Sequence, residues 1–270
     1  MGEIRGASNT ATSYIYMSSY FSPETITWRV HSDPSMVVGG LRALLEQALQ
    51  PDAMAGVSAH SNFRDDTWGR LQRTGDYVGI LTFSPKADAD KLAARVRNVH
   101  AKLSLDDPHL LLWVHMAMVD AFLDVAVRSG LKLTVAEQDQ YFLEMVKFAE
   151  LVGIAPADVP NSLSQTKQYF ADIKPELRAS DDAKRAALFI TIPPLPKIIR
   201  FATPFAPTWG AISTLAGAAL PKWARDLYGA PTLPGQELAT DIALKAFRSS
   251  LLLFPEALRS PPQLKEARSR

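Results

Sequence analysis

The sequence predicts an all-α fold, built as a single irregular domain of about ten helices. Apolar residues recur at spacings of three and four along most of the chain, while alternating β-branched runs are scarce and Asn-Gly or Asp-Gly turns are absent. The composition, 47% hydrophobic and 21% charged over 270 residues, is that of a globular protein. We expect an N-terminal arm over 1–20, the helical domain over 21–256 and a polar tail over 257–270 that frays from Ser260 onward.

Four helices with recognisable ends are predicted in the first half. Pro51 ends the first, Asp65 and Asp66 are placed to cap the second, and Asp106 or Asp107 caps the fourth, with Pro108 in its first turn. The third helix keeps an apolar stripe at helical spacing. The four helices span 37–49, 65–77, 86–103 and 106–128.

The second half begins with the capping box Thr134-x-x-Glu137, which opens a helix that Gly153 closes. Further helices are predicted over 161–173, 181–190, 221–228 and 236–254. Between them, prolines break the chain into short pieces: Pro193, Pro194, Pro196, Pro204 and Pro207. The uncharged stretch 201–220 is interpreted as a pair of buried helices rather than a membrane span, with a dip of this surface into a membrane as the alternative.

Composition excludes several classes of function. The net charge of +1 leaves no positive excess for nucleic acid. The absence of cysteine excludes disulfides, iron–sulfur clusters, thiolate zinc and a cysteine nucleophile, so a metal needs histidine, carboxylate or an organic cofactor. No signal peptide or transmembrane span is expected, and we therefore expect a cytoplasmic protein. The sequence does not give the oligomeric state.

The histidines are the first candidate site residues, and all five lie in the first 115 residues: His31, His60, His100, His109 and His115. His100 lies beside the apolar stripe of the 86–103 helix, and His115 lies on the stripe of the next helix. A buried neutral imidazole can ligate a metal or a haem iron, and the alternative is a core histidine satisfied by its neighbours. Because the hairpin between the two helices is short, we expect antiparallel neighbours with the imidazoles offset by roughly 8 Å.

A second candidate is Arg70-x-x-Arg73-Thr74, whose members share one helix face. Two guanidinium groups can hold a carboxylate or propionate, and the alternative is a solvated face paired with Asp65, Asp66 or Asp76. His60 and Ser61 are interpreted as loop or capping residues. Asp120 and Asp124 are the carboxylates that a two-histidine non-haem iron site would need.

The order of several segments resembles the family shared by rubber oxygenases (latex-clearing proteins) and the ER-bound oxygenase of mycophenolic acid biosynthesis, many of whose members are domains of unknown function. The segments are Gly39–Pro51 (GGLRALLEQALQP), Arg70–Thr74 (RLQRT), Arg97–His100 (RNVH), Asp107–His115 (DPHLLLWVH), Leu151–Gly153 (LVG) and Leu227–Gly229 (LYG). Together they cover about residues 20 to 230.

The resemblance implies an all-helical fold that holds one haem b without covalent attachment and uses dioxygen. It implies that His100 is the axial ligand of the iron, with His115 as second choice. Arg70 and Thr74 match an Arg-x-x-Lys-Thr segment near the haem, in which Arg73 replaces the lysine. Arginine stays protonated, so Arg73 cannot ligate iron as a neutral lysine can. Glu46 is the carboxylate nearest to the position of the family's catalytic glutamate.

The sequence therefore predicts a haem b-dependent oxidoreductase or oxygenase whose partners are dioxygen and a small or apolar organic substrate. His100 would hold the iron and Arg70 a propionate or the distal side, while Arg73, Thr74 and His115 line the pocket. The alternative is a non-catalytic helical binding protein that has lost the haem and keeps an apolar ligand pocket. The short connection between His100 and Asp107 favours that alternative.

Overall fold

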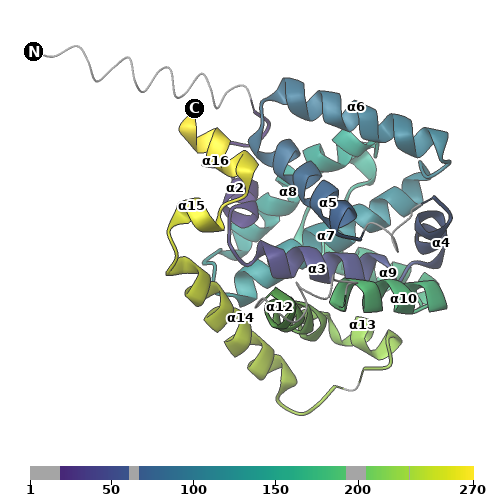
Figure 1. The fold of residues 1–270 in the computed structure, drawn as a ribbon. Coiled ribbons are helices and arrows are strands. Elements are labelled where there is room, and N and C mark those ends of the chain that lie inside the picture. Colours follow the sequence, from purple (N-terminus) through teal and green to yellow (C-terminus); the bar gives the residue numbers. More distant parts are fainter. Residues whose placement is uncertain (1–18, 61–66, 193–204, 231) are drawn as a thin grey trace, which may run out of the picture.

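The computed structural model describes residues 19–60, 67–192, 205–230 and 232–270. These residues form fourteen α-helices and two short 3-10 helices, and they contain no β-strand beyond one isolated bridge between Ser19 and Pro85 (Figure 1). The predicted all-α fold is confirmed.

Two helices form the centre of the fold, α3 (Met36–Gln47) and the longer α7 (Pro108–Arg128), which pack side by side (Figure 1). Helix α7 begins as predicted, since the Asp107 side chain accepts from the backbone N–H groups of His109 and Leu110. Among the described helices, α7 alone is long and apolar enough to cross a membrane. Of its most apolar stretch, 56% is buried inside the fold. A buried core helix meets the same criteria.

One layer of helices covers the His115 side of this centre. It consists of α2 (Ile26–His31), α5 (Thr67–Phe83), α6 (Lys86–Lys102) and α8 (Val135–Val152). The capping box of Thr134 and Glu137 is present at the start of α8, and Gly153 ends the helix with φ 105°. Helix α6 packs on α5 and α8, and α2 packs on α5, α7 and α8.

The opposite layer packs against α3. Its main helices are α4 (Pro51–His60), α9 (Leu163–Ile173), α10 (Asp181–Thr191), α12 (Phe205–Ala219), α13 (Lys222–Leu227) and α14 (Gln236–Leu252), with 3-10 helices at Pro156–Asp158 and Lys174–Glu176. Helix α12 lies between α3 and α14, so α14 is at the outer edge of the molecule (Figure 1).

Besides the two helices of the C-terminal tail, α2 and α4 were not predicted. In α2 the carboxylate of Glu144, from α8, accepts from the backbone N–H groups of Ile26 and Thr27, so a tertiary contact caps this helix. In α4, Pro51 begins a new helix as well as following α3, because proline suits a first helical position.

The boundaries of two other predictions were wrong. Helix α5 continues to Phe83, well past 77, and the prolines predicted to break the chain do not divide α12. Pro207 lies in the first turn of α12, where no backbone N–H is needed. Pro193, Pro194, Pro196 and Pro204 lie outside the described residues, as do the predicted caps Asp65 and Asp66.

The predicted fraying of the C-terminal tail was also wrong. The tail forms α15 (Glu256–Arg259) and α16 (Pro262–Ser269), and α16 packs on α5. Leu264 and Ala267 are buried with Trp28 and Phe83. The two apolar positions are three residues apart and share a face, so one side of a polar helix is sufficient to dock it. Burial of Leu264 alone contributes about 1.5–3 kcal/mol.

Candidate functional site

His115 lies in the core on α7 and is 4% exposed. Its Nε2 atom is buried and has no hydrogen-bond partner in the part of the chain that the structure describes. Desolvation lowers the pKa of His115 to about 3, so the imidazole is neutral at physiological pH. The ring of Phe148, on α8, faces it with 6.4 Å between centroids. A neutral buried imidazole with an unpaired nitrogen is chemically suited to bind a metal ion.

His31 is a core histidine whose two ring nitrogens both have hydrogen-bond partners. Its Nδ1 lies 2.8 Å from the Thr82 hydroxyl, and its Nε2 lies 3.1 Å from the Tyr141 hydroxyl. The Thr82 hydroxyl already donates to the carbonyl of Val78, so it accepts from His31 Nδ1–H. Nε2 is then the acceptor for the Tyr141 O–H. The sequence analysis assigned no role to His31, because its two partners lie 51 and 110 residues away.

Phe148 connects these two histidines with Tyr77. Its ring centroid is 6.3 Å from that of His31 and 5.9 Å from that of Tyr77, in edge-on contacts. The Tyr77 hydroxyl is buried and unpartnered among the described residues, and burial raises the pKa of Tyr77 well above its usual value. We call His31, Tyr77, His115 and Phe148 the aromatic cluster. It holds two buried polar atoms that have no protein partner in the described chain.

His100 lies in the last turn of α6 and is half-buried. Its Nδ1 atom is a further buried nitrogen without a partner in the described ranges. Burial lowers the pKa of His100, and the negative charge of Asp106 opposes that effect. One turn earlier, Arg97 Nη1 donates to the carbonyl of Leu151 at 2.6 Å, which ties α6 to the end of α8. Arg97 therefore helps to fix the turn that carries His100.

The expected close pairing of the helices that carry His100 and His115 was wrong. Helix α6 packs on α5 and α8 rather than along α7. The end of α6 explains the geometry, because Leu105 N–H donates to the carbonyl of His100 and Ser104 N–H donates to that of Ala101. Ser104 takes φ 53°, the left-handed conformation that usually requires glycine. This tight cap turns the chain away from α6 before α7 begins.

The predicted arginine pair lies on α5. The pKa of Arg70 is lowered by burial and by the nearby positive charge of Arg73. Arg73 and Thr74 are exposed, and the Thr74 hydroxyl donates to the carbonyl of Arg70. Asp76, one of the alternative partners, accepts from Gln263. The side chain of His60 and all of Ser61 lie outside the described residues.

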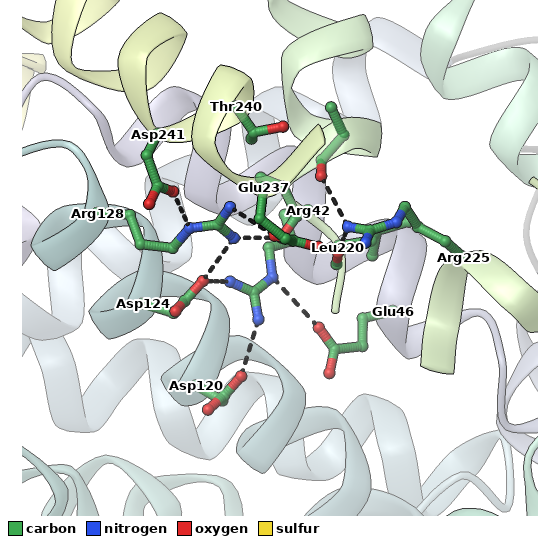
Figure 2. A network of polar contacts seen from close by, with 12 residues as sticks. Arg42, Glu46, Asp120, Asp124, Arg128, Leu220, Arg225, Glu237, Thr240 and Asp241 are labelled. Atoms are coloured by element: carbon green, nitrogen blue, oxygen red, sulfur yellow. Dashed lines mark hydrogen bonds and ion pairs between the residues drawn. The ribbon is translucent and has the colours of Figure 1, made fainter. Parts of the chain in front are cut away.

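A second polar group lies on the other side of α3 and is drawn in Figure 2. The Arg42 side chain is 2% exposed and binds Asp120 at 2.9 Å, with Asp124 in closer contact and Glu46 Oε2 3.5 Å from Nε. Arg128 binds Asp124, Glu237 and Asp241, and Arg225 binds Glu237 and the carbonyl of Leu220. We call these three arginines and five carboxylates the arginine network.

The network joins α3, α7, α13 and α14, and the sequence analysis missed it as a unit. Its signal was present in the i, i+4 pair Arg42 and Glu46 and in the series Asp120, Asp124 and Arg128. Because Arg42 binds both aspartates, they are already neutralised. The described residues contain no group of three metal-ligating side chains, so the non-haem iron alternative gains no support.

Glu46 is the most unusual member of the network. It is fully buried, and neither carboxylate oxygen has a hydrogen-bond donor in the described part of the chain. Desolvation raises the pKa of Glu46 to about 8, against the opposing charge of Arg42. Burial also raises the pKa of Asp120, to about 6. Folding therefore favours the protonated form of the Glu46 carboxyl group.

Comparison with known families matches residues 28–249 to the family described as "ER-bound oxygenase mpaB/B'/Rubber oxygenase, catalytic domain". The corresponding comparisons with curated proteins and with solved structures gave no significant match.

Proposed function

Because the chain belongs to the family of mpaB-type ER-bound oxygenase and rubber oxygenase catalytic domains, we propose that it is a haem b-dependent oxygenase acting on a small or apolar organic substrate. The observation that carries the proposal is the pair of buried imidazole nitrogens without partners, His100 Nδ1 and His115 Nε2. An unpaired buried polar atom costs about 1–3 kcal/mol, which binding to a metal would recover.

Both imidazoles have the protonation state that iron requires. Burial lowers the pKa of each, so each presents a lone pair at neutral pH. In the proposal His100 would hold the iron, as the family resemblance implies from its interval after Arg70–Thr74, and His115 would line the pocket or hold the iron instead. His31 is unsuitable because both of its ring nitrogens are already bonded.

The arginine pair on α5 is chemically suited to bind an anionic group at this end of the fold. Arg70 is largely buried beside Arg73, and two neighbouring guanidinium groups repel each other. A haem propionate would accept a bidentate hydrogen bond from a guanidinium group. Arg73 and Thr74, the exposed members of the same helix face, are proposed to line the entrance.

A bound haem would supply the chemistry of dioxygen, and the residues of this chain would control axial ligation, polarity and access. Tyr77 keeps its proton at physiological pH, because burial raises the pKa of its hydroxyl. Its O–H can therefore donate a hydrogen bond to a polar atom that enters the aromatic cluster. The apolar surroundings of His115 exclude water, which favours apolar substrates.

The test is the absorption spectrum of protein expressed with a haem precursor. Wild type is expected to show a Soret band at one haem per chain, and the band is expected to be lost or shifted in His100→Ala or in His115→Ala. His109→Ala is the matched control, because His109 is exposed and bound to Glu176. A colourless wild type, or spectra unchanged in both variants, would overturn the proposal.

The short α6–α7 connection, with Ser104 in a strained cap, favours the alternative of a binding protein without haem. In that case the colourless protein would be stabilised by an apolar ligand. A rise in melting temperature with oleate, and none with haem, would identify that function.

A further inference from the structure

Large apolar side chains are exposed mainly in one part of the chain, between residues 188 and 258. The most exposed are Leu253 at 86% and Leu258 at 74%, and on α14 itself Leu238 and Ile242 are 66% and 59% exposed. These residues lie on or just after α14, the helix at the outer edge of the fold (Figure 1). Contiguous exposed apolar surface usually marks an interaction site.

The exposed residues of α14 form a stripe. Leu238, Ile242, Ala246, Ser249 and Leu253 follow one another at spacings of four, four, three and four, which places them on one helix face. Only Thr240 and Leu244 of this helix are buried. The stripe therefore faces away from the core along the whole length of α14.

An open groove of about 770 Å³ lies next to this stripe, between α12 and α14. The groove is open because small side chains line it, Ala211 and Ala218 on the α12 wall and Ala239 and Ala243 on the α14 wall. No charged residue occurs from 205 to 220, so the α12 wall and its exposed face are free of charge. The groove and the stripe together form a continuous apolar face, which we call the α12–α14 face.

The charges at the border of this face are not balanced. Glu237 and Asp241, the acidic residues of α14, are both held by arginines of the arginine network. Lys245 is exposed at the edge of the stripe, and no ion pair to it occurs among the described residues. The uncompensated charge beside the apolar face is therefore positive.

We propose that the α12–α14 face is a docking surface for an anionic lipid bilayer. The stripe on α14 would enter the boundary between headgroups and acyl chains, and Lys245 would lie at the level of the anionic headgroups. A bilayer suits this face better than a protein partner, because the face offers apolar side chains and few hydrogen-bonding groups. The helix would lie in the plane of the membrane and not cross it.

Flotation with vesicles of phosphatidylcholine and phosphatidylglycerol in equal amounts tests the proposal, with the full chain. The double variant Ile242→Asp/Leu253→Asp is expected to keep its helical circular dichroism, because both side chains are exposed, and to float at least roughly fivefold less than wild type. Lys245→Glu is expected to reduce flotation as well. Val135→Asp/Leu143→Asp is the matched control, since these residues are 66% and 52% exposed on α8, away from the face.

Wild type that stays with the soluble fraction would overturn the proposal, and so would a face variant that floats like wild type. The proposal would also fail if sedimentation showed a wild-type dimer that the face variant dissociates, with neither protein bound to vesicles. In that case the face would join two copies of the chain.

Discussion

The aromatic cluster and the arginine network lie on opposite sides of α3 and α7 and solve the burial of polar groups in opposite ways. The cluster buries neutral imidazoles and a protonated tyrosine, and it leaves His115 Nε2 and the Tyr77 hydroxyl unpaired. The network buries charged groups in ion pairs, and Arg42 alone contacts three carboxyl groups, although the Glu46 oxygens have no hydrogen-bond donor among the described residues. In the proposed function the cluster receives a ligand, whereas the ion pairs of the network connect α3, α7, α13 and α14.

The largest expected effect is in the network. Arg42→Met removes the cation shared by Glu46, Asp120 and Asp124. The buried Glu46 and the partly exposed Asp120 then lose their cationic partner, whereas Asp124 keeps Arg128. We expect a loss of about 3–5 kcal/mol in the free energy of unfolding, measured with urea at pH 7. Arg29→Met, which breaks an exposed ion pair with Glu137, is expected to cost less than about 1 kcal/mol. An equal loss in the free energy of unfolding in the two variants would contradict a larger contribution from the buried ion pairs than from the exposed one.

The second effect is acid sensitivity of the cluster in the haem-free protein. The folded pKa of His115 is about 3, below its ordinary 6.5, so its contribution to stability is present above pH 6.5 and is lost as pH falls toward 3. His115→Leu is expected to reduce the slope of stability against pH by about 1.4 kcal/mol per pH unit between pH 4 and 6. His109→Leu, at an exposed site, is the control. An unchanged slope in His115→Leu would contradict the burial of a neutral imidazole.

The third effect runs in the opposite direction with pH. The folded pKa of Glu46, about 8, lies above its ordinary 4.5, so folding favours the protonated carboxyl. Its contribution is present below pH 4.5 and is lost as pH rises through 8. Glu46→Gln is expected to be more stable than wild type at pH 8.5 and to weaken less between pH 6 and 8.5. The control Glu266→Gln changes an exposed carboxylate; the same pH profile in both variants would refute the assignment.

The smallest effect concerns the cap beneath His100. Ser104 has φ 53°, which costs a non-glycine residue about 1–2 kcal/mol. Ser104→Gly is expected to stabilise the protein by roughly 1 kcal/mol in urea unfolding, without altering helix content. A destabilised Ser104→Gly would mean that the serine side chain supports the turn. Ser129→Gly is the comparison, because Ser129 has ordinary helical angles at the end of α7.

Local signals were sufficient to predict much of the fold. Asp107 with Pro108, and Thr134 with Glu137, carry their capping chemistry within four residues, and both helices begin as expected. Helix α2 was missed although Thr25 caps it locally, because it has only six residues and Glu144 binds its first N–H groups from 117 and 118 residues away. Helix α16 was missed because its two buried positions have meaning only against Trp28 and Phe83.

The site residues were harder to predict from local sequence signals. The sequence marks His31, His100 and His115 as histidines near apolar residues, and only the tertiary partners separate them. Thr82 and Tyr141 satisfy His31, whereas His115 has a phenyl ring as its neighbour. The arginine network was visible as i, i+4 pairs, but its closure through Glu237 and Asp241 depends on the packing of α14.

Rescue by free imidazole tests the central claim, haem ligation by a helix histidine, most directly. We expect His100→Gly or His115→Gly to lose the wild-type Soret band, and we expect added imidazole to restore it in the variant that has lost the ligand. His109→Gly should need no rescue. Wild-type spectra in both glycine variants without imidazole, or no band in any variant with or without it, would contradict the claim.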